Sequence, residues 1–196
     1  MAKIPFYKLH GLGNDFVLLD FRKRSHKLSR TQIRKIGDRK RGVGFDQLLI
    51  IEKKNRLHIY NTDGSRAEMC GNGLRAAAFY LWDIGAPKIP SKNIIGIHTD
   101  AAFLRCRRLK QGLIECEMGR PRILSEKLQI KAAGRKFNLC VVDVGNPHAI
   151  CFDWPKSRKQ FHEWGAAIET HKAFPKRTNV QFVRKLGAGK IEVLVW

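Results

Sequence analysis

The sequence predicts an α+β fold with few helices, each held against a curved sheet, and two similar domains. Three observations lead to this prediction: short strand-like runs recur along the chain, only three segments have helical spacing, and one arrangement of motifs occurs twice. The chain has 196 residues, of which 43% are hydrophobic, and this is enough for one domain or two small ones.

The predicted strands are short apolar runs rich in β-branched residues, at 16–19, 48–51, 141–142 and 180–183. Ser29 and Gln32 have the spacing of a capping box, which predicts a helix through Ile33 and Ile36. Helical spacing also predicts a helix after Gly73, with its apolar stripe at Leu74, Ala77, Ala78 and Leu81, and a third helix at Phe161, Trp164 and Ile168.

An internal repeat is the most informative feature of the organisation. A Gly-Asn pair precedes a strand at Asn14 and again at Asn146, and in both halves a helix and a second strand follow. That second strand begins near Gln47 in the first half and near Asn179 in the second. The spacing from Asn14 to Asn146 equals the spacing from Gln47 to Asn179, which indicates two similar domains. We expect their boundaries at 1–118 and 119–196.

Composition limits the possible classes of function. Lysine and arginine number 38 against 17 acidic residues, a net charge of +21 that could support phosphate binding. The basic residues are scattered and lack an array of stacking aromatic residues, so we expect a solvated basic surface and no nucleic-acid partner. No apolar run is long enough for a membrane-spanning helix, and the N-terminus lacks a signal-peptide pattern. The five cysteines form no close-set metal motif, which favours a reduced, cytoplasmic location.

Cys70 is the strongest candidate for chemistry. It lies in a Cys-Gly-Asn-Gly run where the second predicted helix begins, and there the helix dipole and backbone N–H groups would lower the pKa of a thiol. Gly71 and Gly73 would let a substrate carboxylate approach the backbone closely. A buried cysteine at a tight turn is the alternative interpretation. We interpret the other four cysteines, at 106, 116, 140 and 151, as core residues.

Two asparagines and one histidine are weaker candidates. Asn14 and Asn146 each lie in a turn before a strand, where the amide could bind a polar substrate group or simply form the turn. The loop at 10–16 lacks the glycine spacing of a nucleotide-binding loop. His148, taken alone, is more often structural than a ligand.

Five motifs together are much more specific than any one of them. They lie at 10–16, 42–47, 61–73, 145–148 and 174–180, and in this order the sequence resembles the diaminopimelate epimerases over essentially its whole length. Thr62 and Lys176 stand where the family usually has Ala and Glu. The resemblance implies two domains, each a β-sheet wrapped around a central helix, with the substrate held between them.

The resemblance also implies an isomerase that interconverts LL- and meso-diaminopimelate in lysine and peptidoglycan precursor biosynthesis, without pyridoxal phosphate, any other cofactor or a metal. One cysteine removes the α-proton while a second delivers a proton to the opposite face. By motif, Cys70 is one of these two thiols and His148 has an orienting role. The implied substrate-binding residues are Asn14, Gln47, Asn61, Gly71, Asn72, Asn146 and Asn179.

The sequence also departs from the family pattern. The family continues past the strand that ends at Trp196 with an Ala-Cys-Gly-Thr-Gly motif, which residues 1–196 lack. We therefore expect a truncated chain with an incomplete second domain, exposed apolar sheet surface and impaired or absent epimerase activity. We also expect a homodimer. The alternatives are a related isomerase of the same fold, such as a proline racemase or phenazine-type isomerase, and a non-catalytic relic that binds a partner through its basic surface.

Overall fold

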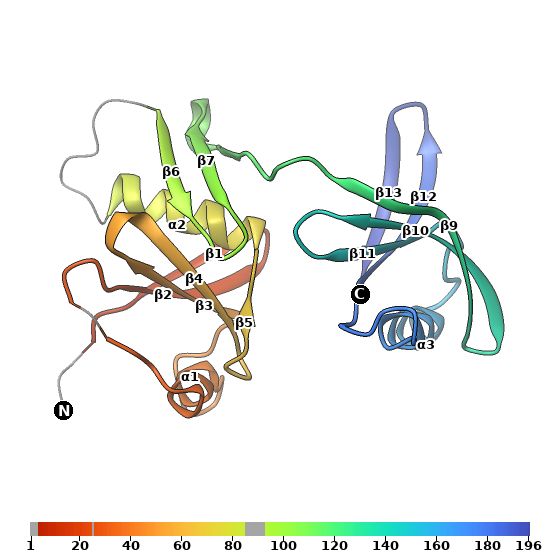
Figure 1. Ribbon diagram of the computed structural model, residues 1–196, viewed down its shortest axis with the longest axis horizontal. Coiled ribbons are helices and arrows are strands. Elements are labelled where there is room, and N and C mark those ends of the chain that lie inside the picture. Colours follow the sequence, from red (N-terminus) through yellow and green to blue (C-terminus); the bar gives the residue numbers. More distant parts are fainter. Residues whose placement is uncertain (1–3, 25, 85–92) are drawn as a thin grey trace. The chain divides into compact units, whose positions relative to one another are not determined.

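The computed structural model describes residues 4–24, 26–84 and 93–196, and the chain divides into two units, Met1–Met118 and Gly119–Trp196 (Figure 1). Among these residues each unit has one sheet, of eight strands in the first unit and five in the second, with few helices. The predicted α+β fold is confirmed. No helix in the described part of the chain is both long and apolar enough to span a membrane.

The first unit is a mixed sheet with strand order β1-β2-β3-β4-β6-β7-β8, and β5 pairs with β4. Its strands are β1 (Tyr7–Gly11), β2 (Asn14–Asp20), β3 (Gln47–Glu52), β4 (Arg56–Asn61), β5 (Arg66–Ala67), β6 (Ile94–His98), β7 (Phe103–Arg108) and β8 (Ile114–Cys116). Its helices are α1 (Arg30–Gly37), α2 (Gly71–Asp83) and the single turns η1 (Lys53–Asn55) and η2 (Lys110–Gly112).

Helix α2 is the centre of the first unit, because the sheet curves around it and contributes contacts from β1, β2, β3, β4, β6 and β8. Small residues allow the close approach: a Cβ atom added at Gly73 would lie 3.0 Å from Leu49 Cδ2. The alanines of α2 are buried against Phe16, Leu18 and their neighbours on β3 and β4. A helix of this length would be only marginally stable in isolation. Most of the stability of α2 comes from burial of its apolar face against the sheet.

Helix α1 packs on the opposite face of the same sheet, where Ile33 lies among Val17, Leu48 and Phe45. The predicted capping box is confirmed. Ser29 Oγ accepts a hydrogen bond from the Gln32 backbone N–H at 3.2 Å, and Gln32 Oε1 accepts one from the Ser29 N–H at 2.8 Å. The first sheet is thus covered on both faces.

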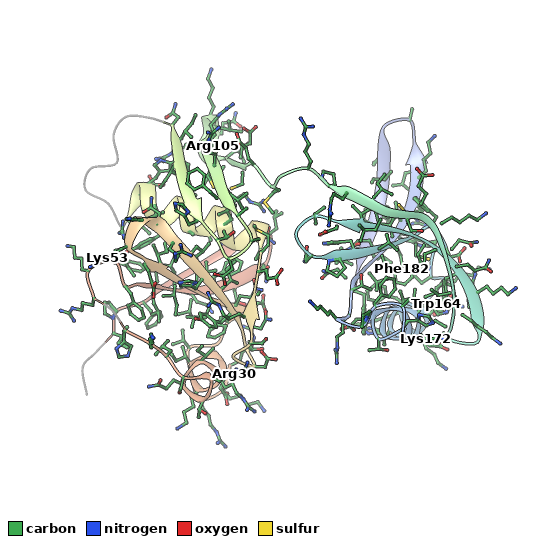
Figure 2. All side chains as sticks on the ribbon, in the orientation of Figure 1. Arg30, Lys53, Arg105, Trp164, Lys172 and Phe182 are labelled. Atoms are coloured by element: carbon green, nitrogen blue, oxygen red, sulfur yellow. The ribbon has the colours of Figure 1, made fainter. Side chains whose placement is uncertain are left out.

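The second unit is a sheet with strand order β13-β12-β11-β10-β9. Its elements are β9 (Arg122–Ala132), β10 (Arg135–Asp143), β11 (Pro147–Cys151), α3 (Arg158–Glu169), β12 (Asn179–Gly187) and β13 (Lys190–Val195). The predicted third helix is therefore α3. It packs on one face of the sheet, where Trp164 on α3 and Phe182 on β12 lie close together (Figure 2), with ring centroids 6.3 Å apart.

The two units share a topology that the sequence repeat anticipates. In each, an antiparallel pair leads into a parallel pair joined by a helix, and a further antiparallel strand follows: β1-β2-α1-β3-β4 and β10-β11-α3-β12-β13. In the first parallel pair Phe16 lies opposite Gln47, and in the second His148 lies opposite Asn179. The register of the parallel strands therefore repeats at the same spacing as the sequence motifs.

The second sheet differs from the first on the face away from α3. No helix within residues 119–196 packs there, and the apolar side chains of β13 are exposed: Ile191 at 62%, Val193 at 42% and Val195 at 65%. In the first unit the matching face is sealed by α2. This agrees with the exposed apolar sheet surface expected from the sequence.

Candidate active site

The candidate site of the first unit lies at one end of its sheet, beside the N-terminus of α2. Asn14 and Gln47 begin the parallel strands β2 and β3, and Asn61 ends the neighbouring antiparallel strand β4. Because side chains alternate along a strand, these three residues share the face that carries Phe16, Leu49 and their buried neighbours under α2. Polar side chains from three strands are thus brought to the end of an apolar core.

Cys70 is the N-cap residue of α2. Its backbone is extended, at φ −150° and ψ 111°, and its Sγ accepts a hydrogen bond from the Gly73 N–H at 3.3 Å. Sγ also lies 4.0 Å from Asn14 Oδ1. The Cys70 side chain is half-buried. The prediction of a thiol at the helix N-terminus is confirmed.

Asn72 is hydrogen-bonded to Asn14, the residue beside the Cys70 sulfur. Its Nδ2 donates to Asn14 Oδ1 at 3.5 Å, and its Oδ1 accepts a hydrogen bond from Arg75, one turn along α2. Asn14 Nδ2 in turn donates to Asp46 Oδ2 at 3.0 Å. Gly71 lies beside Met118, and a Cβ atom added at Gly71 would be 3.3 Å from Met118 Cε. A side chain at position 71 would therefore require the Met118 side chain to shift by a few tenths of an ångström.

Gln47 and Asn61 form a second pair of amides at the same end of the sheet. Gln47 Nε2 donates to Asn61 Oδ1 at 3.1 Å, and Asn61 Nδ2 donates to Ser65 Oγ at 3.1 Å. Gln47 Oε1 is buried and has no hydrogen-bond partner among the described residues. An unpaired buried carbonyl oxygen is costly, so this atom is an acceptor that a bound donor group would satisfy.

The electrostatics of Cys70 correct one expectation. Burial raises the pKa of the Cys70 thiol above its ordinary value, and this outweighs the backbone N–H groups of Gly73 and Asn72 and the charge of Arg75, which lower it. The predicted lowering of the pKa by the helix end is therefore wrong in net direction. Sequence reasoning identified the stabilising N–H groups but not the desolvation under the sheet, which favours the neutral thiol.

The candidate residues of the second unit also lie together, at the start of its parallel strand pair. The ring Nε2 of His148 is 3.0 Å from Asn146 Oδ1, and Asn179 Nδ2 donates to the Pro147 carbonyl oxygen at 3.2 Å. These contacts hold one end of each amide. On the same face of β12, Gln181 Oε1 is buried without a hydrogen-bond partner among the described residues, as Gln47 Oε1 is in the first unit.

Three residues that hydrogen-bond to the candidate amides of the first unit were not predicted as site residues from the sequence: Asp46, Ser65 and Arg75. Arg75 follows Asn72 by three positions on a predicted helix, so helical spacing could have identified it. Ser65 lies within the Asn61 motif but was given no role, and nothing local marks Asp46 as the partner of Asn14. In the described part of the chain no group of three or more His, Cys, Asp and Glu side chains could hold a metal ion.

Solved structures with the same fold include a racemase, an epimerase and a phenazine biosynthesis protein. A probable proline racemase from Agrobacterium radiobacter matches 98% of this chain and 70% of its own, with a TM-score of 0.73 and 11% identity. A hydroxyproline epimerase from Agrobacterium vitis matches 97% of this chain and 69% of its own, with a TM-score of 0.71 and 12% identity. A Bacillus anthracis phenazine biosynthesis protein of the PhzF family has a TM-score of 0.67. At these identities the likeness shows the fold alone.

Sequence relatives are more specific. The family profile described as diaminopimelate epimerase matches residues 6–124. The diaminopimelate epimerase of Carboxydothermus hydrogenoformans is 34% identical over 98% of this chain and 76% of its own length, and that of Pseudomonas savastanoi pv. phaseolicola is 34% identical over 98% and 75%. The chain therefore belongs to the diaminopimelate epimerase family of isomerases.

Proposed function

We propose that Cys70 is one of the two acid/base thiols that interconvert LL- and meso-diaminopimelate, a step of lysine biosynthesis. The observation that carries this proposal is the position of Cys70 Sγ at the N-terminus of α2, next to Asn14 and Asn72. A thiol in this position can exchange a proton with a carbon atom whose carboxylate is bound at the start of the helix, by N–H groups that do not already donate to the sulfur. The first N–H groups of a helix have no carbonyl acceptor within the helix.

The raised pKa of Cys70 has a consequence for the reaction. A pKa above the ordinary value keeps Cys70 in its thiol form at neutral pH, and this form can deliver a proton. For removal of a proton, binding of the substrate has to favour the thiolate. A substrate ammonium group near the sulfur would favour the thiolate, as the charge of Arg75 already does, whereas exclusion of water would oppose it.

The amide groups supply the chemistry for binding an amino acid. In our proposal Gln47 Oε1 accepts a hydrogen bond from a substrate ammonium group, and Asn14, Asn61, Gly71 and Asn72 complete the contacts from the first unit. Asn146 and Asn179 contribute from the second unit, where His148 orients the amide of Asn146. The side-chain amides carry no charge. They can therefore form hydrogen bonds with both the ammonium and the carboxylate group of the substrate without changing the net charge of the site.

Two further proposals concern the oligomeric state of the enzyme and its location in the cell. We propose that it works as a homodimer, because exposed apolar strands of the second sheet favour association. We also propose a cytoplasmic location, where the Cys70 thiol would stay reduced.

Protection from alkylation tests the assignment of the site. Diaminopimelate should slow the reaction of Cys70 with iodoacetamide, followed by mass spectrometry of the peptide that carries it, and should leave the rate at Cys140 unchanged. Asn14→Ala and Asn72→Ala should each weaken the protection, because both side chains adjoin the sulfur.

The matched control for these variants is Asn138→Ala, an exposed asparagine on β10, which should leave the protection unchanged. Equal alkylation of Cys70 with and without a saturating concentration of diaminopimelate would contradict the proposal.

A further inference from the structure

Two cysteines outside the candidate site face each other across β7 and β8. Cys106 and Cys116 are directly opposite in this antiparallel pair, and their sulfur atoms are 3.0 Å apart. A disulfide bond is about 2.05 Å long, so a shift of about 1 Å would join the two atoms. Neither cysteine belongs to the contacts of Cys70 described above.

The backbone register suits a cross-strand bond. The neighbouring pair is hydrogen-bonded, since the Glu117 N–H donates to the Arg105 carbonyl oxygen at 2.8 Å. Hydrogen-bonded and non-hydrogen-bonded pairs alternate along an antiparallel ladder, so Cys106 and Cys116 form a non-hydrogen-bonded pair. In such pairs the Cα atoms are about 4.5 Å apart and the side chains closer, within the range of natural disulfides.

We propose that Cys106 and Cys116 form a reversible intrachain disulfide, a redox site separate from Cys70. The two positions are unequal, which suggests an order of events. Cys116 is half-buried, whereas Cys106 is fully buried among the core residues around Ile95 and Leu104. The hydrogen-bonding contact with Cys106 and the charge of Arg75 lower the pKa of Cys116. Cys116 is therefore the attacking sulfur.

The reaction balances with a small disulfide such as glutathione disulfide as oxidant. The Cys116 thiolate attacks one sulfur of glutathione disulfide, and the first glutathione leaves as a thiolate. Cys106 then loses its proton and attacks Cys116 Sγ, which releases the second glutathione. Two cysteine thiols are oxidised to one disulfide, and glutathione disulfide is reduced to two molecules of glutathione.

The pair is also connected to the candidate site through the chain. Two residues after Cys116, Met118 lies against Gly71, beside Cys70. A disulfide would fix β8 to β7 and so restrict the strand that leads to this contact. The redox site itself does not depend on the proposed function of Cys70, and the two can be tested separately.

The test uses the full chain, reduced and then equilibrated in glutathione buffers of increasing oxidised fraction. After acid quenching and blocking of free thiols, the chain is cleaved with chymotrypsin without reduction, and the peptides are identified by mass spectrometry. We expect a Cys106 peptide linked to a Cys116 peptide, lighter than the two thiols by two hydrogen atoms. Cys70→Ser and Cys140→Ser should form the same linked pair.

Single variants test the order of events. Cys106→Ser should leave Cys116 as a glutathione adduct, and Cys116→Ser should leave Cys106 unmodified. Absence of the linked pair in the most oxidising buffer, with the chain still folded by circular dichroism, would overturn the proposal. So would preferential linkage of Cys70 to either cysteine. Should a variant fail to fold, the linkage map of the unsubstituted chain decides the question alone.

Discussion

The two sheets differ most on the faces away from α1 and α3. Leu49 on β3 is buried under α2, whereas Gln181, its counterpart on β12 in the repeat, has a buried side-chain oxygen without a partner among the described residues. Across from them, Ile59 is 1% exposed and Val195 is 65% exposed. Two sheets with the same strand order thus have faces of very different exposure. The cause is helix α2, which begins at Cys70 and buries this face of the first sheet.

Truncation of matched residues on these faces should have the largest effect. Ile59→Ala should cost about 2–5 kcal/mol, because it opens a cavity under α2, whereas Val195→Ala should change stability by no more than about 0.5 kcal/mol. Hydrogen exchange resolved by peptide reports the stability of each unit separately. Equal losses at the two positions would show that the second face is covered in solution.

The N-caps of α1 and α3 are a closer match between the units. Ser29 Oγ and Ser157 Oγ each accept a hydrogen bond at 3.2 Å from the backbone N–H three residues later. Ser29→Ala and Ser157→Ala should each cost about 1 kcal/mol, measured by the same hydrogen-exchange method, because one donor at the helix end loses its acceptor. Asp at either position should restore most of the loss. A loss at only one position would mean that the two helices contribute unequally to their units.

Low pH should lower the stability of the first unit more than that of the second, although this difference should be smaller than those above. The hydrogen bond from Arg39 is the largest cause that holds the pKa of Asp15 well below its ordinary value of 3.8, with a further contribution from Lys8. This carboxylate therefore stabilises the fold above pH 4, and the contribution is lost as the pH falls below 3.8. In the repeat, Pro147 and Thr178 stand at the positions that correspond to Asp15 and Asp46, so the second unit lacks this cluster of ion pairs.

Asp15→Asn should accordingly reduce the stability of the first unit by about 1 kcal/mol or less at pH 7, since Arg39 is largely exposed. It should also flatten the decline in stability below pH 4, measured by urea unfolding at a series of pH values. An unchanged pH dependence in this variant would assign the acid response to other groups.

Local patterns were sufficient for much of this fold. The capping box at Ser29, the apolar stripe after Gly73 and the strand-like runs at Phe16 and Val180 each depend on neighbours within a few residues, and all are confirmed. The internal repeat predicts two similar domains, and the register of both parallel strand pairs repeats at the same spacing.

What the sequence could not provide depends on contacts between distant segments. The net rise in the pKa of Cys70 comes from burial against strands that lie far from it in the sequence, which no local motif reports. The Cys106–Cys116 contact requires the register of β7 and β8, and that is set by the turn between them. Both cysteines were interpreted as simple core residues for this reason.

The most direct test of the account is deuterium uptake at the α-carbon of diaminopimelate in D₂O. The other four cysteines lie in strands β7, β8, β10 and β11, so Cys70 is the one thiol at a helix N-terminus in the described part of the chain. The account predicts that this uptake falls by about 10² to 10⁴-fold in Cys70→Ser and is retained in Cys140→Ser. Uptake that survives Cys70→Ser would contradict it.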